Sequence, residues 1–188
     1  MATATQIRLT EEEFLAADWS GYELVDGEPV DIPRGGRDAW LAGALFYRIA
    51  QFFDRHAVGL IFPQGTEFKA WPQRPNHLRK PDTMVFVNGR FPGDEPPDGT
   101  IDIAPDLAAE VVSPNDNAQA LEEKVQEYLD AKVRLVWVIY PEIRTAHVFR
   151  RGEAAARIGP TGSLDGEDVL PGFRLPLADL FPAKAPGR

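Results

Sequence analysis

The stretch of residues 107–140 constrains the fold more than any other part of the chain. It begins and ends with apolar runs, residues 107–112 and 135–140, and the apolar residues between them recur at helical spacing. The second run is too continuously apolar for a half-exposed strand, so we expect a central strand that is covered on both faces. The stretch therefore predicts a buried strand, a helix and a second buried strand. These elements indicate an α/β fold with a mixed central sheet flanked by helices.

The length and composition agree with a single domain that spans residues 1–188. Hydrophobic residues make up 44% and charged residues 26% of the chain, which is ordinary for a folded soluble protein. No apolar run approaches the roughly 20 residues that a membrane-spanning helix needs, and the first residues lack the layout of a signal peptide. We therefore expect a cytoplasmic protein that does not enter a membrane. Because the chain has no cysteine, disulfides and thiolate metal sites are excluded.

Local signals place the other elements. A capping-box pattern opens a short helix at about residues 10–18, and an Asp-Gly turn predicts an N-terminal β-hairpin at residues 22–32. Apolar residues at three- and four-residue steps predict a long helix at about residues 38–55. Residues 88–105 are dense in Pro, Gly and Asp and indicate a surface loop rather than a linker between domains. Further strands are expected at residues 59–62, 66–70, 83–87 and 143–149.

Two acidic residues stand where the core is expected. Glu110 interrupts the apolar run at residues 107–112, and Asp82 follows Pro81 at the start of the strand at residues 83–87. Carboxylates are rarely buried unless they are paired or bind a cation, and hard cations prefer oxygen ligands. The two acids therefore indicate a metal site. Two simpler alternatives stay open: Asp82 caps the entry to its strand, or Glu110 pairs with an arginine in the core.

The helix between the two buried strands carries a lysine that can reach the same place. The expected buried stripe of this helix, at about residues 117–131, consists of Ala118, Leu121, Val125 and Leu129. Lys124 lies at the edge of the stripe, about 100° from its centre and one turn before Tyr128, so its long side chain can cross toward the sheet. The alternative is an exposed lysine that pairs with Glu127. Glu127 itself is expected on the opposite, solvent-facing side.

The net charge of −9 does not favour nucleic-acid binding, because duplex binding depends on Lys and Arg that neutralise phosphates. A divalent cation at the acidic site and a local basic patch would both soften this conflict. Candidates for a basic patch are Arg74, His77, Arg79 and Lys80 before Asp82, and Arg34 and Arg37 in a glycine-containing loop. The alternative is that these are solvated loop residues without a ligand.

Several short motifs occur in an order that resembles a known family. They are YELVDGE at residues 22–28, Pro81-Asp82, EVVSP at residues 110–114, Lys124 with Tyr128, WVI at residues 137–139 and LPGF at residues 170–173. In this order they resemble the Uma-type restriction endonuclease family, which belongs to the PD-(D/E)XK nuclease superfamily. The similarity covers nearly the whole chain. It implies a restriction-endonuclease-like fold and a homodimer.

The resemblance also implies a site, in which Asp82 and Glu110 are metal ligands and Lys124 is a lysine that has moved from the strand to the helix. The sequence departs from the family pattern in ways that bear on activity more than on fold. Val112 stands in place of the usual lysine, Asp38-Ala39 where relatives often carry a histidine, and Ala120 where they often carry an acid.

These observations predict a Mg²⁺-dependent endonuclease that hydrolyses phosphodiester bonds in DNA, with Mn²⁺ as a substitute ion. Asp82, Glu110 and a backbone carbonyl such as that of Val111 would hold the ion. Lys124 would orient the nucleophile or neutralise the developing charge. The competing hypothesis is a nuclease-like fold kept as a non-catalytic module for oligomerisation or protein interaction. The acidic charge and Val112 support this alternative.

Three further expectations concern the surroundings of the site. Glu23 in the hairpin is an accessory candidate, although a solvent-facing position is the stronger expectation for it. Lys80 competes with Lys124 for the cationic role but is expected in a loop just outside its strand. Large apolar residues in loops and in the C-terminal part favour a homodimer; they are Trp71, Phe91, Phe173 and Phe181.

Overall fold

The structure, a computed structural model, describes residues 7–32 and 35–182. Its described helices are α1 (Glu11–Ala16), α2 (Gly36–Phe53) and α3 (Ala118–Asp130), with the 3₁₀ turns η1 (Pro92–Asp94) and η2 (Leu177–Leu180). Its strands are β1 (Tyr22–Val25), β2 (Glu28–Asp31), β3 (Gly59–Pro63), β4 (Thr83–Val87), β5 (Leu107–Val111), β6 (Leu135–Tyr140), β7 (Thr145–Phe149), β8 (Ala156–Ile158), β9 (Ser163–Asp165) and β10 (Arg174–Pro176).

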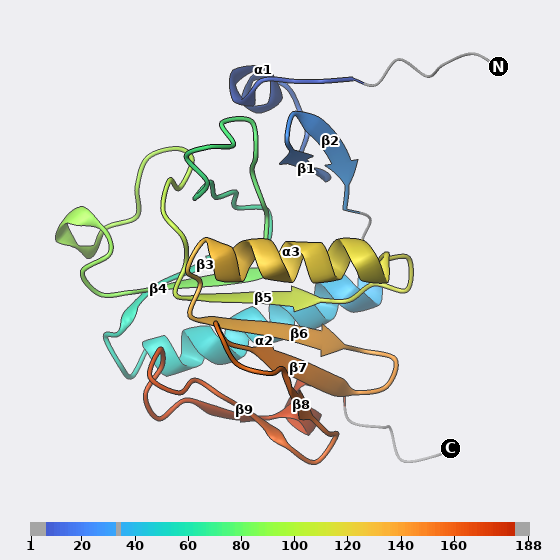
Figure 1. Ribbon diagram of the computed structural model, residues 1–188. Coiled ribbons are helices and arrows are strands. Elements are labelled where there is room, and N and C mark those ends of the chain that lie inside the picture. The colour runs from blue at the N-terminus through green and yellow to red at the C-terminus, as the bar shows by residue number, and fades with distance from the viewer. Residues whose placement is uncertain (1–6, 33–34, 183–188) are drawn as a thin grey trace.

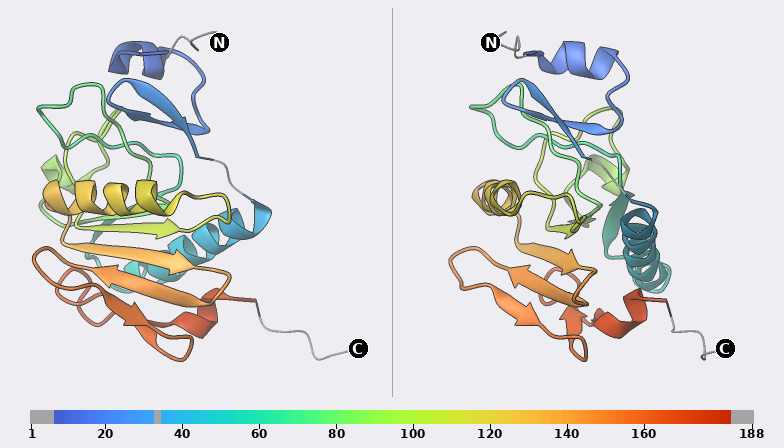
Figure 2. Two further views of the ribbon diagram at one scale, coloured as in Figure 1. Left: turned by 45° about the vertical axis from the view of Figure 1, so that its right-hand side comes forward. Right: turned by 90° about the vertical axis from the view of Figure 1, so that its right-hand side faces the viewer.

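A six-stranded sheet in the order β3-β4-β5-β6-β7-β8 forms the centre of the molecule. Helix α3 covers one face of the sheet and α2 the other, while α1 and the β1–β2 hairpin stand at one end (Figure 1). The right-hand view of Figure 2 shows the strands between the two long helices. The predicted α/β architecture, with a mixed central sheet and an N-terminal hairpin, is therefore confirmed.

Strands β5 and β6 run parallel, and α3 connects them. Every other neighbouring pair in the described sheet is antiparallel. A parallel pair needs a crossover long enough to return the chain to the same end of the sheet, and a helix supplies it. Both strands are almost fully buried, in keeping with their continuous apolar runs.

Two apolar layers attach the helices to the sheet. On one face, Leu41, Leu45 and Ile49 of α2 pack against the sheet and the C-terminal part of the chain. On the other face, Val125 and Tyr128 of α3 pack against alternate residues of the same strands. None of the described helices combines the length and the apolar composition that are needed to cross a membrane.

Helix α1 begins with the predicted capping box. The Thr10 hydroxyl accepts a hydrogen bond from the backbone N–H of Glu13, and the Glu13 carboxylate accepts one from the Thr10 N–H. The helix ends at Ala16 rather than near Asp18. In the hairpin that follows, Asp26 takes a positive φ of 51° at the turn, a conformation that aspartate tolerates better than most residues.

The hairpin is attached to the segment that precedes β4. The Leu24 N–H donates to the Leu78 carbonyl at 3.2 Å, and the Leu78 N–H donates to the Leu24 carbonyl at 2.7 Å. Phe14 of α1 packs against the same two leucines, so a small separate core forms beneath the hairpin. This attachment fixes the position of Glu23, the residue before Leu24.

Some strand predictions were wrong or incomplete. Residues 66–70 form no strand; Phe68 makes only isolated bridges, since the chain around it is rich in proline, which cannot donate to a ladder. Strand β7 begins at Thr145 rather than at Ile143 because Arg144 has a positive φ of 50° and belongs to the turn. The strands β8, β9 and β10 were not predicted, because three residues each are too few to show a period.

The apolar loop residues that favoured a homodimer are buried in the structure. Trp71, Phe91, Phe173 and Phe181 are only 6%, 9%, 5% and 7% exposed. They belong to the two apolar layers of the sheet, because the loops fold back onto it. The exposed large apolar side chains include Trp40 and Tyr47 of α2 and Ile143. The homodimer therefore stays a prediction and loses this support.

Gly59 provides a test of the edge of the sheet. It has a φ of 153°, and a Cβ added there would lie 1.9 Å from the Phe86 carbonyl oxygen. We expect Gly59→Ala to lower the free energy of unfolding in urea by at least about 2 kcal/mol, since the backbone of β4 would have to move. The control is Gly43→Ala in α2, where an added Cβ meets nothing within 4 Å and alanine favours the helix by about 1 kcal/mol. Equal losses in the two variants would contradict this placement of β3.

Candidate active site

Asp82 and Glu110 lie side by side on the face of the sheet that α3 covers. Strands β4 and β5 are antiparallel with Thr83 opposite Ala109, so Asp82, just before Thr83, lies next to Glu110, just after Ala109. The Asp82 N–H donates to the Ala109 carbonyl at 3.0 Å, and the Asp82 carboxylate accepts from the Val111 N–H at 2.7 Å. Asp82 is 1% and Glu110 5% exposed. The structure therefore brings the two predicted acids together in a buried position.

Glu110 receives its partners from α3. The Tyr128 hydroxyl donates to Glu110 Oε1 at 2.6 Å, and Lys124 Nζ lies 3.8 Å from the same oxygen. Burial raises the pKa of Glu110 to about 7; Lys124 and Tyr128 oppose the rise, whereas the charges of Asp82 and Glu23 add to it. The alternative in which Glu110 pairs with a core arginine is wrong, because its cationic partner is a lysine.

Lys124 points toward the sheet and is 14% exposed at its side chain. Its Nζ lies 3.0 Å from Glu23 Oε2, closer than to Glu110. The predicted approach of Lys124 to a site carboxylate is thus confirmed, whereas its catalytic role stays a prediction. Burial lowers the pKa of Lys124, but the charges of Glu110 and Glu23 outweigh it and raise the pKa above its ordinary value. The ammonium group is therefore charged at neutral pH.

Glu23 is buried in the site, so the expectation of a solvent-facing position is wrong. It is 1% exposed because the attachment of Leu24 to the segment before β4 turns its neighbour inward. Glu23 Oε1 accepts from the Lys80 N–H at 2.8 Å, and Oε2 accepts from Arg79 at 2.9 Å as well as from Lys124. Burial raises the pKa of Glu23, but Lys124 and Arg79 outweigh it and lower the pKa to about 2.

A chain of ion pairs continues outward from Glu23. Arg79 donates to Glu127 Oε2 from Nε at 2.8 Å and from Nη2 at 2.5 Å. Arg74 joins Glu127, at 2.8 Å, to Asp26 in the hairpin turn, at 2.6 and 2.7 Å. Acidic and basic groups alternate along this path, so each charge has a partner of opposite sign.

Glu127 takes part in this chain instead of facing solvent, and it does not pair with Lys124. Burial raises its pKa, but hydrogen bonds and charges from His77, Arg79 and Arg74 outweigh it and lower the pKa to about 2. The stripe prediction for α3 missed this contact because the loop at residues 71–80 packs beside the helix, and helical spacing does not show loops.

The described basic residues among the candidates for a DNA-binding patch have partners within the protein. Arg74 and Arg79 are in the ion-pair chain, and His77 contacts Glu127 at 3.2 Å. Arg37 binds Glu142 at 2.5 Å, and Arg34 lies outside the described residues. Lys80 is 5% exposed; its Nζ donates to the Trp19 carbonyl at 3.2 Å and lies over the Phe14 ring. Lys80 therefore does not compete with Lys124 at the site.

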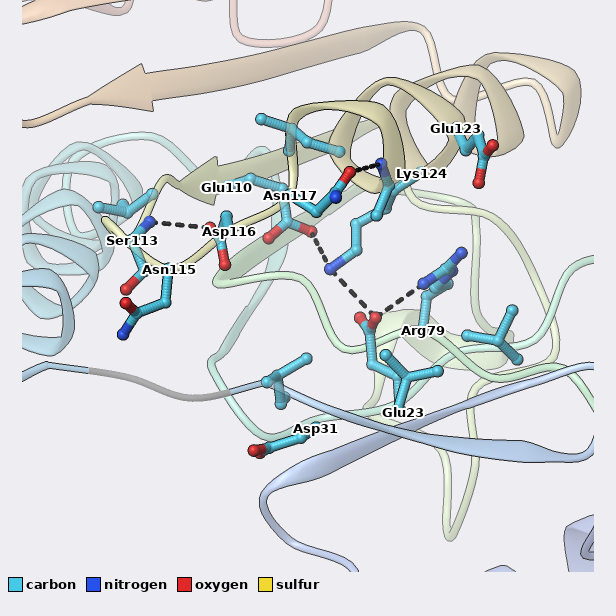
Figure 3. A pocket seen from close by; sticks show the side chains of 16 residues that line it. Glu23, Asp31, Arg79, Glu110, Ser113, Asn115, Asp116, Asn117, Glu123 and Lys124 are labelled. Atoms are coloured by element: carbon cyan, nitrogen blue, oxygen red, sulfur yellow. Dashed lines mark hydrogen bonds and ion pairs between the residues drawn. The ribbon is translucent and has the colours of Figure 1, made fainter. Parts of the chain in front are cut away.

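A cavity of about 430 Å³ is lined by four of the charged site residues, Glu23, Arg79, Glu110 and Lys124 (Figure 3). In Figure 3, Lys124 lies between Glu110 and Glu23, and Arg79 approaches Glu23 from the other side. Val30 and Ile32 of the hairpin segment and Ala120 and Leu121 of α3 supply apolar walls. Acids also line the cavity, namely Asp31, Asp116 and Glu123, and Asp116 accepts from the Ser113 N–H.

The donor set fits a hard divalent cation with a small protein contribution. Asp82 and Glu110 supply carboxylate oxygens, and Mg²⁺ is often bound through one or two carboxylates with water filling the other positions. Among the described residues there is no group of three His, Cys, Asp or Glu side chains placed to hold a metal ion. Val112, where the lysine is usual, is half-buried and packs in the apolar layer beneath α3. The role of the Val111 carbonyl stays a prediction.

Comparison with known proteins agrees with this geometry. The model of the Uma2 family, described as "Putative restriction endonuclease", matches residues 11–178. The chain belongs to this family. A crystal structure described as a "putative nuclease belonging to DUF820" from Anabaena variabilis has a TM-score of 0.78 and 20% sequence identity, with 92% of this chain and 97% of that chain covered. This likeness shows that the two chains share a fold. No curated protein matches.

Membership in the Uma2 family confirms the resemblance that the motifs indicate. The matched region contains Glu23, Asp82, Glu110 and Lys124. The sequence analysis predicted the last three as site residues, whereas it expected Glu23 to face solvent. The available signal was its position in the YELVDGE motif, directly before the leucine that enters a core. The contribution of Tyr128 was visible only as its spacing of four residues from Lys124, which places both side chains on one helix face.

The raised pKa of Glu110 makes the stability of the metal-free protein depend on pH. Its pKa in the folded state, about 7, lies above the ordinary glutamate value of 4.5, so folding favours the protonated form. The stabilisation is fully present below about pH 4.5 and is lost as the pH rises through 7. With EDTA present, we expect Glu110→Gln to gain stability relative to the wild type between pH 5 and pH 8, measured by urea denaturation. Parallel pH profiles for the two proteins would show that Glu110 is ionised normally.

Proposed function

We propose that this member of the Uma2 family is a metal-dependent endonuclease that hydrolyses phosphodiester bonds in DNA. The observation that supports the proposal is that Asp82 lies beside Glu110 in the sheet, while Glu110 and Lys124 together line one cavity. Two carboxylates that can hold a divalent cation, beside one buried ammonium group, are the parts that phosphodiester hydrolysis needs. The nuclease family and fold agree with this chemistry.

In this proposal Asp82 and Glu110 bind Mg²⁺, or Mn²⁺ in its place. When bound, the ion would lower the pKa of a coordinated water and stabilise charge on the phosphate. The Val111 N–H, which donates to Asp82, orients that carboxylate, and Tyr128 orients Glu110. Because Glu110 has a pKa of about 7, a proton competes with the metal, and binding should strengthen as the pH rises through 7.

Lys124 supplies the positive charge that the usual lysine would supply from the strand. Its ammonium group is charged and lies beside Glu110. From this place it can hydrogen-bond the attacking water or neutralise charge that develops on the phosphate. The Lys124 side chain is only 14% exposed, so little bulk water surrounds the charge.

A non-catalytic module for oligomerisation or protein interaction is the second candidate. The observation in its favour is that the buried charges already balance one another: Lys124 lies closer to Glu23 than to Glu110. Arg74, His77 and Arg79 are likewise paired with acids, and Lys80 is bonded to a backbone carbonyl, which leaves few contacts for a phosphate backbone. The two candidates differ in their response to metal and to DNA.

The first test is metal-dependent stabilisation. For a Kd of ~1 mM, 10 mM Mg²⁺ would stabilise the folded protein by about 1.4 kcal/mol and raise Tm by about 3 to 6 °C. We expect Asp82→Asn and Glu110→Gln to lose this rise, measured by differential scanning calorimetry at pH 8. Asp31→Asn removes a carboxylate that lines the cavity away from the pair and should keep the rise. An equal rise in all four proteins would exclude the proposed ligands.

The second test is cleavage. Lys124→Ala should reduce the rate of plasmid and oligonucleotide cleavage by about 10²- to 10³-fold, the loss that follows removal of one transition-state donor. Its metal-dependent rise in Tm should remain, because Lys124 is not a ligand. The control is Lys132→Ala, which removes an exposed lysine beyond the far end of the same helix. If Lys124→Ala cleaves DNA at the wild-type rate, the catalytic role of Lys124 is excluded. If the wild type cleaves no DNA with any metal, the non-catalytic module is favoured.

A further inference from the structure

Lys124 is shared unequally between two carboxylates. Its Nζ lies 3.0 Å from Glu23 Oε2 and 3.8 Å from Glu110 Oε1. At 3.0 Å the ammonium is within hydrogen-bond distance of Glu23, whereas 3.8 Å is too long for a hydrogen bond to Glu110. Glu23 is therefore the nearer partner. The hydrogen bond that Glu110 accepts comes from an uncharged group, the Tyr128 hydroxyl. The lysine therefore forms a longer ion pair with the proposed metal ligand than with Glu23.

Glu23 is itself held on both of its oxygens. Oε1 accepts from the Lys80 backbone N–H, and Oε2 accepts from the Arg79 guanidinium at 2.9 Å. Arg79, only 6% exposed, is fixed in turn by Glu127. A carboxylate that is 1% exposed and bonded from three sides is a rigid anchor for the ammonium group.

We infer that Glu23 is a positioning residue that holds Lys124 away from Glu110 and so keeps Glu110 available to the metal. This inference rests on the proposed function, since it concerns the same ion. Without the Glu23 charge, the nearest anion for the Lys124 ammonium would be Glu110. A lysine paired with Glu110 would compete with the metal for the carboxylate, and it would leave the place from which it reaches the phosphate.

Direct ligation by Glu23 is the alternative explanation for any effect of Glu23 on metal binding. The geometry does not favour it, because Glu23 Oε2 already contacts two cationic groups and Oε1 is bonded to the backbone. The two explanations differ in one respect. A positioning residue acts only through Lys124, whereas a ligand acts whether or not Lys124 is present.

A double-mutant cycle separates them. Mg²⁺ and Mn²⁺ binding would be measured by titration calorimetry at pH 8 on the wild type, Glu23→Gln, Lys124→Met and the double variant. We expect Glu23→Gln to raise the Kd by about tenfold or more, the usual size of an effect from a group behind the ligands. In the Lys124→Met background the same change should alter the Kd by no more than about twofold. The control is Glu123→Gln, which removes a carboxylate lining the cavity on the same helix and should act equally in both backgrounds.

The outcomes are distinct. The positioning role is overturned if Glu23→Gln loses equally much affinity in both backgrounds. It is also overturned if Glu23→Gln loses no affinity in the wild-type background. In either case metal binding by the wild type leaves the proposed function intact. A wild-type protein that binds neither ion contradicts the proposed function and the inference with it. If Glu23→Gln does not fold, Glu127→Gln loosens Arg79 from its outer end. It should then give the same pattern, a raised Kd that returns to within about twofold of its reference when Lys124 is Met.

Discussion

A carboxylate in the middle of a buried strand is the constraint on which the site depends. Glu110 stands on β5 between two apolar layers, where an uncompensated charge is costly. The sheet itself offers no cation, because the neighbours of Glu110 in it are Asp82, just before β4, and Val138 of β6. The charge of Glu110 therefore has to be compensated by groups outside the sheet, on the face that α3 covers. Helix α3 therefore carries Lys124 and Tyr128 four residues apart, so that both side chains descend on the same carboxylate.

The charge of Lys124, which is itself largely buried, needs compensation in turn. Its charge needs a second anion, and Glu23 of the hairpin supplies it; Glu23 then needs Arg79, and Arg79 needs Glu127. The alternation ends where Arg74 meets Asp26 at a half-exposed turn, where water can screen the charge. This series of ion pairs explains why basic residues gather before β4 in a chain of net charge −9. Arg74, His77 and Arg79 are accounted for by acids within the protein, so they are weak evidence for a DNA-binding surface.

Parts of this arrangement could be predicted from the sequence because they depend on local patterns. Continuous apolar runs identified β5 and β6, helical spacing identified α3, and a charge inside an apolar run identified Glu110. The burial of Glu23 and the partners of Glu127 could not be predicted in this way. Both depend on where the hairpin and the loop at residues 71–80 pack, which are contacts between segments far apart in the sequence. The same reason accounts for Trp71 and Phe173, whose loops fold back over the sheet.

A lysine that reaches this site from a helix has other requirements than a lysine on the strand. Two residues after Glu110, a lysine would leave the strand on the same face, and the pleat would fix its spacing from the carboxylate. At position 124 the lysine reaches the site through four flexible methylene groups from a separate element, and nothing in α3 decides which anion it meets. A group outside α3 has to fix the position of the ammonium, and Glu23, which forms an ion pair with it, is the group that can do so. The hairpin is then part of the site in this chain, whereas a chain with a strand lysine would have no such need of it.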